Sequence, residues 1–268
     1  MLYFTILRIS IAERLAYRVD FALGTLMRFL PVVTQIFLWD AIFQGMKTGT
    51  GAIAGYNYHD LIAYYLLTMV GRAFSSMPGL ASGIARDIRD GTIKKYLLQP
   101  VDMLSFVMMS RVAHKLVYYG VAVAPFALVF WLCRGYFNGW PDAWTMLAFI
   151  ASLLMSFLLG FFLEATLGMI GFWFLEVSSL LFIYMLLSFF LSGQMFPLDM
   201  MPSYWPAVLK IIPLQYLAYF PAAVFLQKVT GADLARGLAV EALWVVFFYV
   251  SARILFHYGV RRYSAFGG

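Results

Sequence analysis

The side chains of this chain that could do chemistry gather in one short segment, Pro78 to Pro100. Six charged residues fall within ten positions there, whereas the stretches on both sides are long and apolar. They are Arg86, Asp87, Arg89, Asp90, Lys94 and Lys95. Each carboxylate has an arginine or lysine close by in the sequence that would pair with it, so proton-transfer catalysis is disfavoured. Charge-assisted contact with another protein is the chemistry that this pattern favours.

Catalytic and nucleotide-binding motifs are missing from the sequence. The histidines, His59, His114 and His257, are far apart, and no Gly-x-Ser-x-Gly motif occurs. The run GMKTGTG at residues 45–51 resembles a phosphate loop but lacks Gly-Lys-Ser/Thr at the required spacing. Cys133 is the only cysteine, which excludes an internal disulfide and a cysteine metal cluster. We therefore expect no enzyme activity, metal or cofactor in this chain.

Composition places the chain in a membrane. Of its 268 residues, 63% are hydrophobic and 12% are charged, which is about half the charge of a soluble domain. The net charge of +6 would suit nucleic acid, but the cations punctuate apolar stretches instead of gathering on one polar surface. Cations in that arrangement set the orientation of a membrane protein. The sequence therefore predicts an all-α integral membrane protein with a single transmembrane domain, residues 1–268.

Six apolar stretches are long enough to cross a hydrocarbon core of about 30 Å. They run approximately over Phe21–Phe43, Asp60–Met77, Leu104–Leu132, Trp144–Trp173, Ser178–Phe196 and Asp233–Tyr258. Before them, apolar residues recur at helical spacing within residues 1–19, which predicts a helix lying in the membrane interface. The alternative is a ragged start to the first span. Charged residues interrupt this beginning, so we expect no cleaved signal peptide.

The charged segment has an amphipathic pattern. Ile84, Ile88, Ile93, Leu97 and Leu98 recur at roughly helical spacing opposite the charges, and an Asp-Gly pair ending at Gly91 interrupts them. The pattern predicts a short helix, a turn and a return to the membrane, with residues 81–98 outside it. The alternative is a solvated loop whose positive charge only orients the chain.

Residues 196–228 form a second unusual segment. Five of the chain's ten prolines lie between Gly193 and Gly231, mixed with tyrosine, tryptophan and phenylalanine. The segment is too apolar for a free loop and too interrupted for one straight span. Two short re-entrant helices on the outer side of the membrane, covered by protein, satisfy both facts.

The distribution of positive charge orients the six predicted spans. Ten Lys and Arg residues lie on the side of the two termini, and five lie on the opposite side. The first group is Arg8, Arg14, Arg18, Arg86, Arg89, Lys94, Lys95, Arg253, Arg261 and Arg262, and the second is Lys47, Arg134, Lys210, Lys228 and Arg236. Because cytoplasmic loops carry the excess of Lys and Arg, we expect both termini and the charged segment in the cytoplasm.

Polar groups within the spans mark a candidate path across the membrane. Glu164 falls within the fourth span, where an acidic side chain is costly enough to indicate function. If that span ends near Leu163, however, Glu164 is an ordinary interfacial residue. The other candidates are polar residues within the fifth span that would face a dimer interface: Tyr184, Ser188, Ser192 and Gln194. Their alternative role is a hydrogen bond to a neighbouring helix.

Together these features resemble the permease subunits of type-2 ABC exporters. The resemblance rests on the first helix, the six spans, the run GIARDIRDGTIKKYLLQPVD after the second span and the proline-rich segment after the fifth. It covers essentially the whole chain. The Arg-Asp-Gly-Thr-Ile and Leu-Leu-Gln-Pro runs are similar to those of a bacterial subfamily of small permeases without a fused ATPase. The resemblance therefore implies a multi-pass protein of the bacterial inner membrane.

The resemblance also implies partners and roles. Two such permeases pair, as a homodimer or a heterodimer, and each docks on a separate ATPase subunit that holds ATP and Mg²⁺. Residues 1–19 resemble the elbow helix, residues 81–98 the coupling helix that sits in a cleft of the ATPase, and residues 196–228 the re-entrant outer helices. The resemblance implies transport out of the cytoplasm, but the family's substrates differ widely. Phe189 and Phe190 of the fifth span suit a path for a hydrophobic or amphipathic cargo. The residues assigned to the ATPase contact are Ile84, Arg86, Asp87, Arg89, Asp90, Gly91, Thr92 and Lys94.

Two other classes of protein are compatible with the sequence. Broken helices and an acid within a span suit an ion-coupled secondary transporter or a channel. That class predicts internal symmetry, yet the charged segment has no counterpart after the fifth span. An assembly subunit that pairs with a second permease and transports nothing alone is also compatible. Binding to an ATPase separates the exporter from the ion-coupled transporter.

Overall fold

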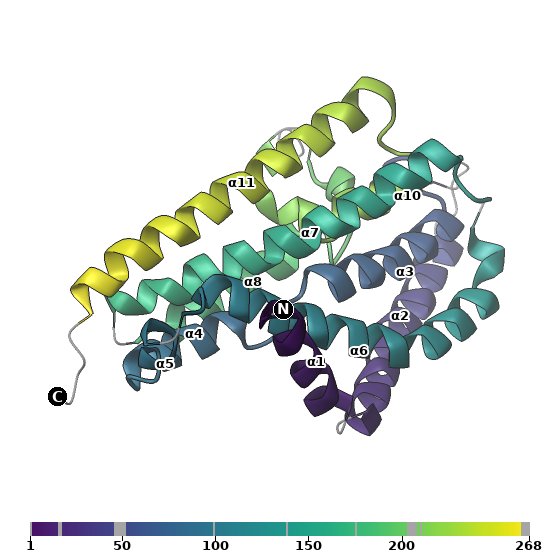
Figure 1. Cartoon of the computed structure of the whole chain (residues 1–268). Helices are drawn as coiled ribbons and strands as arrows, with labels where there is room; N and C mark the ends of the chain where they lie inside the picture. Colours follow the sequence, from purple (N-terminus) through teal and green to yellow (C-terminus); the bar gives the residue numbers. More distant parts are fainter. Residues whose placement is uncertain are drawn as a thin grey trace.

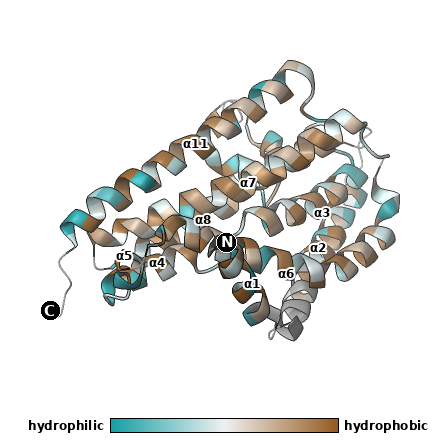
Figure 2. Ribbon diagram, viewed as in Figure 1, coloured by the Kyte–Doolittle hydropathy of each residue, from teal (hydrophilic) through white to brown (hydrophobic). Residues whose placement is uncertain are grey.

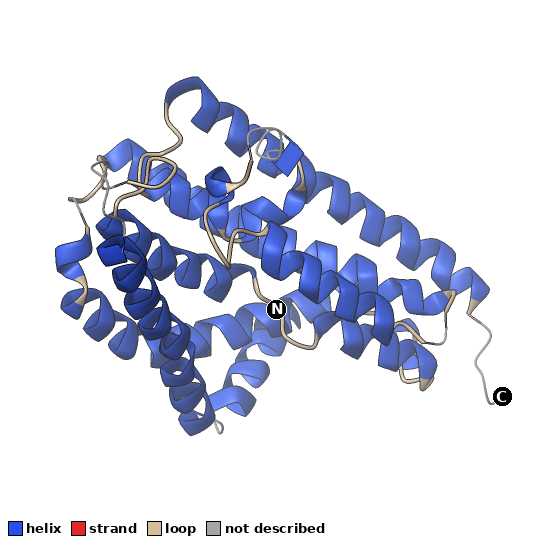
Figure 3. Cartoon of the chain, turned by 180° about the vertical axis from the view of Figure 1, so that it is seen from behind, coloured by secondary structure: helices blue, strands red, loops and turns tan. Residues whose placement is uncertain are grey.

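The computed structural model describes residues 2–15, 18–45, 52–98, 100–137, 139–174, 176–202, 208–209 and 211–263. These residues are mostly helical, and no β-strand occurs among them (Figure 3). The predicted all-α class is therefore confirmed. With η marking 3-10 helices, the elements are α1 Leu2–Leu15, α2 Arg18–Gly45, α3 Tyr58–Ser75, α4 Leu80–Arg89, α5 Lys94–Leu97, α6 Met103–Leu132, η1 Arg134–Tyr136, α7 Ala143–Met169, η2 Ile170–Phe172, α8 Ser178–Leu191, η3 Leu198–Met200, η4 Pro213–Leu217, α10 Tyr219–Phe225 and α11 Gly231–Arg262.

The helices α7 and α11 lie side by side and run in the same direction (Figure 1). Near their beginnings, the Ser152 hydroxyl of α7 donates a hydrogen bond of 2.9 Å to the carboxylate of Glu241 on α11, and both residues are fully buried. Near their ends, the ring of Phe172 occupies the place that a side chain at Gly259 would need. Contacts at both ends fix the register of the pair.

The helix α3 lies at the centre of the fold, packed on α2, α7 and α10. Asn57 caps it by accepting a hydrogen bond of 2.8 Å from the backbone N–H of Asp60, which satisfies one of the unpaired donors of its first turn. Most of its side chains are buried. Because α4 follows after only four residues and packs on the end of α7, α3 connects the core directly to the charged segment.

The two amino-terminal helices cover α6. The helix α1 packs across α6, and α2 packs on both α3 and α6 (Figure 1). Phe4 and Ile9 of α1 remain exposed at 73% and 63%, which leaves an apolar face open to lipid. A helix before the first span is thus present. The predicted range 1–19 includes residues 1 and 16–17, which lie outside the described residues.

Among the described residues, three helices are long and apolar enough to cross a membrane: α6, α7 with its extension η2, and α11. Residues 29–45 of α2 and the whole of α8 are shorter apolar helices. Figure 2 shows that apolar residues dominate α6, α7 and α8, whereas the region around α5 and the last turns of α11 are hydrophilic. These two hydrophilic regions, around α5 and at the end of α11, lie at the same end of the molecule, as an aqueous boundary there would require.

The fifth predicted span proves shorter than expected. The helix α8 ends at Leu191 instead of Phe196, and its 14 residues extend about 21 Å, less than a hydrocarbon core of about 30 Å. Gly193 has φ +78°, and a Cβ there would lie 2.7 Å from both the Tyr64 hydroxyl and the Tyr219 Cβ. Only glycine fits this packed left-handed turn, so the helix ends before it.

The proline-rich segment forms the short helices η3, η4 and α10, and α10 is buried against α3 and α7. Asp199 accepts hydrogen bonds from the hydroxyls of Tyr56 at 2.9 Å and Tyr219 at 2.6 Å. Burial raises the pKa of Tyr56 well above its ordinary value, and the charge of Asp199 raises it further. The tyrosine therefore stays a donor and holds the segment against the beginning of α3. Of the predicted range 196–228, residues 203–207 and 210 lie outside the described residues.

Candidate functional site

The apolar face of α4 packs against the end of α7. Ile84 and Ile88 are each 4% exposed, and Ile93, just after the turn, is fully buried in the same cluster. The two helices approach closely because α7 has Gly168 at the contact, where a Cβ would lie 2.7 Å from the carbonyl oxygen of Ala81. The helix α4 is therefore held on the core, as the amphipathic pattern predicts for Ile84 and Ile88. The pattern is wrong for Leu97 and Leu98, which are exposed at 40% and 85%.

A tight turn joins α4 to α5, with Gly91 at φ +77°, a backbone conformation that glycine adopts at no steric cost. The Asp87 carboxylate accepts hydrogen bonds from the Thr92 hydroxyl at 2.7 Å and pairs with the Lys95 ammonium at 3.2 Å. The backbone carbonyl of Asp87 accepts from the amide of Ile93 at 2.9 Å. Partial burial alone would lower the pKa of Lys95, but the hydrogen bond to Asp87 raises this pKa above its ordinary value. Asp87 thus organises the turn.

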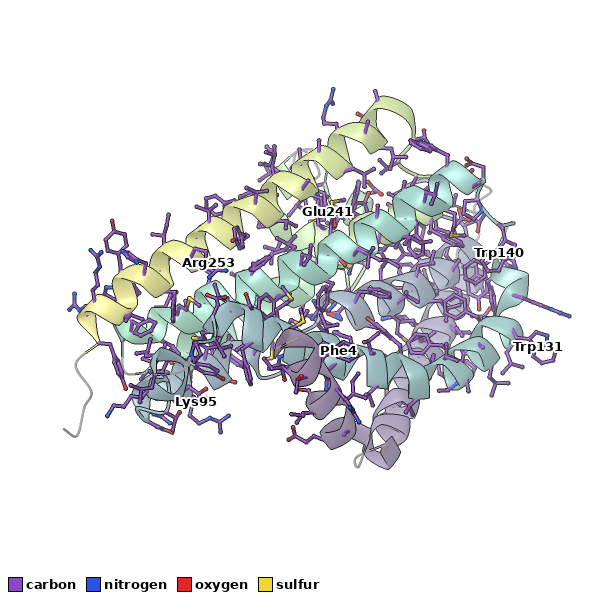
Figure 4. The ribbon with its side chains drawn as sticks, viewed as in Figure 1. Phe4, Lys95, Trp131, Trp140, Glu241 and Arg253 are labelled. Carbon is purple, nitrogen blue, oxygen red and sulfur yellow. The ribbon has the colours of Figure 1, made fainter. Side chains whose placement is uncertain are left out.

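The predicted contact residues divide by exposure. Five of them present exposed side chains at this end of the molecule: Arg86, Arg89, Asp90, Thr92 and Lys94. Asp87 and Gly91 are half-buried, and Ile84 faces the core, so it anchors the helix and offers no contact surface. Arg89 also lies 3.9 Å from Glu176, in the loop before α8. Figure 4 shows Lys95 and Arg253 toward this end and Trp131 and Trp140 at the opposite end.

A cavity of about 390 Å³ lies beside the charged segment, between the α3–α4 junction, α7 and α8. Four of the five residues predicted for a path across the membrane line it: Glu164, Tyr184, Ser188 and Gln194. The remaining one, Ser192, is fully buried, and its backbone carbonyl accepts a hydrogen bond of 2.9 Å from the amide of Tyr219. Ser192 therefore has a place in packing and lies away from the cavity.

Positive charge surrounds Glu164. Arg72, at the end of α3, lines the same cavity, and the charges of Arg72, Arg111 and Lys115 all act on the Glu164 carboxylate. Sequence reasoning identified Glu164 but not Arg72. The available signal was that Arg72 lies one or two helical turns before the charged segment. Glu164, which lines the same cavity, lies on α7, far from Arg72 in the sequence.

The junction between α3 and α4 is fixed by side chains of α6. The Lys115 ammonium donates to the carbonyl oxygens of Ala73 and Ser76, the latter at 2.7 Å. The Arg111 guanidinium donates to the carbonyl oxygen of Pro78 at 2.9 Å. The carbonyl oxygen of Ala73 belongs to the last turn of α3, where carbonyls have no partner within the helix. Ser76 and Pro78 follow the end of α3. Lys115 and Arg111 therefore hold the corner of the chain between the core and the charged segment.

The charged segment and the cavity are parts of one structure. Ala81 and Ser82 line the cavity, and they lie on the same short helix as Ile84 and Asp87. Residues 76–79 of the junction line it as well. A displacement of α4 therefore changes the wall of the cavity directly, without an intervening element. Within the described residues, no group of three or more His, Cys, Asp or Glu lies close enough to hold a metal ion.

Comparison with known proteins gives one family. A family model described as ABC-2 family transporter protein matches residues 29–267, which leaves out only the first 28 residues and the last one. A search of curated proteins finds no match.

Proposed function

The chain belongs to the ABC-2 transporter family, and from this premise we propose that it is the permease subunit of an ATP-driven exporter. It is a multi-pass membrane protein. In the proposed complex it pairs with a second permease, as a homodimer or heterodimer, and each permease contacts a separate ATPase subunit. ATP and Mg²⁺ are held by that partner, and hydrolysis takes place there.

The observation that carries the proposal is the continuity between an exposed charged surface and the cavity beside Glu164. Arg86, Arg89 and Lys94 are exposed on a helix whose opposite face is buried on α7. A rigid helix with apolar anchors and charged outer residues suits contact with a mobile partner, because charge-assisted bonds fix the register of the contact. When the ATPase subunits close on ATP, they would displace α4, and α4 would reshape the cavity.

The proposed arrangement in the membrane has more spans than the three described helices that are long and apolar enough to cross it. We propose six spans with both termini and the α4–α5 segment on the cytoplasmic side of the bacterial inner membrane. In this arrangement α1 is the interfacial elbow helix, and the segment from η3 to α10 supplies the re-entrant outer helices. The burial of α10 supports this arrangement. Every residue of α10 is buried, and irregular backbone at membrane depth must be covered by protein.

The cavity beside Glu164 is the proposed start of the transport path. Phe189 lines it together with Leu181 and Met185, so its wall combines apolar surface with the polar side chains of Glu164 and Arg72. Such a surface suits a hydrophobic or amphipathic cargo with a polar group, because Glu164 and Arg72 can meet the polar group while the apolar wall accepts the rest.

Co-purification from the native cell tests the proposal. We expect the wild-type chain in mild detergent to retain an ATP-hydrolysing subunit, and Arg86→Glu and Lys94→Glu to retain at least tenfold less of it. Arg236→Glu is the matched control, because this exposed arginine lies at the start of α11, at the opposite end of the molecule. Recovery of the chain with no ATPase would contradict the exporter and favour an ion-coupled transporter. Equal losses in all three variants would contradict the assignment of the contact to α4–α5.

A further inference from the structure

A second cavity, of about 520 Å³, lies between α3, α6, α7 and α10, at the end opposite to the charged segment. Figure 4 shows Trp131 and Trp140, which both line it, at that end of the molecule. Their side chains are also exposed to the outside, at 59% and 83%. The cavity therefore opens at the surface of the bundle, where the chain of a neighbouring lipid can enter.

Half of the residues that line it are aromatic. Phe225 of α10 is the centre of this wall, with ring centroids at 5.2 Å from Phe149, 6.0 Å from Phe137 and 6.1 Å from Trp140. Phe130 stacks on Phe137 at 5.7 Å. Edge-to-face and stacked contacts of this kind hold the rings in place. The wall is therefore apolar and preformed, which suits a flexible hydrocarbon chain.

Arg134 is the single charged residue of the lining. It follows α6 directly, and its guanidinium lies 5.4 Å from the centre of the Trp131 ring. It forms no ion pair with an acidic residue in the described part of the chain. A cation at the edge of an otherwise apolar cavity is complementary to a ligand with one negative group and a long apolar part.

The surroundings identify that ligand. Trp131, Trp140 and Trp144 are all exposed at this end, and exposed tryptophans collect where hydrocarbon meets lipid headgroups. Arginine binds phosphate through two parallel hydrogen bonds, more specifically than lysine does. We propose that the cavity binds an anionic phospholipid, with an acyl chain among the phenylalanine rings and the phosphate at Arg134. The site is separate from the proposed transport path and does not depend on it.

Native mass spectrometry of the purified full-length chain tests this site. The protein in mild detergent is mixed with equal amounts of phosphatidylglycerol and phosphatidylcholine with identical acyl chains. We expect the wild type to retain phosphatidylglycerol with a preference on the order of tenfold, because phosphatidylglycerol is a net anion, whereas the choline cation of phosphatidylcholine offsets its phosphate and repels the Arg134 guanidinium. Arg134→Gln is expected to reduce the preference to about parity, whereas Arg236→Gln, an exposed arginine at the same end, is expected to keep it.

A second variant tests the apolar part. Ala127 lines the cavity, so Ala127→Trp is expected to reduce retention of both lipids at least fivefold, while Leu243→Trp on the exposed face of α11 leaves it unchanged. Size-exclusion chromatography identifies a misfolded variant, in which case the milder Ala127→Leu replaces it. Equal retention of the two lipids by the wild type overturns the proposal. So does full retention in Ala127→Leu and Ala127→Trp, or equally tight binding of glycerol phosphate, which has the headgroup but no acyl chain.

Discussion

Asp87 is the residue on which the geometry of the charged segment depends. Its carboxylate accepts from Thr92, and its carbonyl holds the amide of Ile93. Thr92→Val removes the hydroxyl donor at constant shape, and we expect a cost of about 1 kcal/mol, which speeds hydrogen exchange of the Ile93 amide about fivefold. Thr92→Ser keeps the donor and is the matched control. Exchange at the wild-type rate in Thr92→Val would show that this bond does not hold the turn.

Asp102 predicts a pH dependence of stability. It caps α6 by accepting from the Ser105 amide at 2.8 Å, and Arg253 of α11 donates to its other oxygen. Partial burial alone would raise its pKa, but the bonds from Ser105 and Arg253 outweigh burial and hold the pKa of Asp102 below its usual 3.8. A lowered folded pKa means that the carboxylate stabilises the fold above pH 3.8 and that this contribution is lost as pH falls through the folded pKa.

The corresponding measurement is thermal unfolding of Asp102→Asn between pH 7 and pH 3. At pH 7 we expect this variant to be less stable by about 0.5–1 kcal/mol, because a partly exposed ion pair is worth little more. The difference from the wild type should shrink below pH 3.8. A difference that stays constant down to pH 3 would show that the charge of Asp102 does not contribute.

At the residue scale, sequence reasoning identified residues whose role follows from local pattern and missed those whose partners are distant. The exposed charges of α4 and the turn at Gly91 follow from spacing along one segment. Lys115 holds the α3–α4 junction only because α6 returns beside it, and Arg72 shares a cavity with Glu164 only because α7 packs on α3. Ile84 was assigned to the partner contact, yet it is buried, because the amphipathic pattern does not say which face meets the chain's own core.

The proposed transmission of movement through α4 depends on its close approach to α7. A Cβ at Gly168 would lie 2.7 Å from the Ala81 carbonyl oxygen and 2.9 Å from the Ile84 Cβ. We expect Gly168→Val to cost about 1–3 kcal/mol by forcing the helices apart and to reduce retention of the ATPase subunit. Gly83→Ala, on α4 with no neighbouring atom within 4 Å, is the control and should keep both. Normal retention in a stable Gly168→Val protein would contradict rigid transmission through this contact.

The lengths of the elements show where sequence reasoning was sufficient. The predicted ranges for α6, α7 and α11 agree with the structure within a few residues, because long apolar runs bounded by polar residues specify a helix. The end of α8 depends instead on Tyr64 and Tyr219 closing on Gly193. The sequence shows the glycine but not the two tyrosines that leave it no space.

At the scale of the whole molecule, the orientation in the membrane is a direct prediction. Cys133 is the only cysteine, so a Cys133→Ser background allows single thiols to be placed at either end. We expect a membrane-impermeant maleimide to label Arg236→Cys in intact cells and to label Lys94→Cys only after permeabilisation. Both side chains are exposed, so access to the reagent decides the outcome. Labelling of Lys94→Cys alone in intact cells would invert the proposed orientation.

We propose that this permease receives the movement of a separate ATPase through α4–α5. Site-specific photo-crosslinking in intact cells tests this contact. A photoreactive amino acid is placed at Arg86, at Lys94 and, as a control, at Trp144, which is 74% exposed at the opposite end. We predict that the first two positions capture an ATP-hydrolysing protein and that Trp144 does not. Absence of such a product from Arg86 and Lys94, or the same product from all three positions, would contradict the claim.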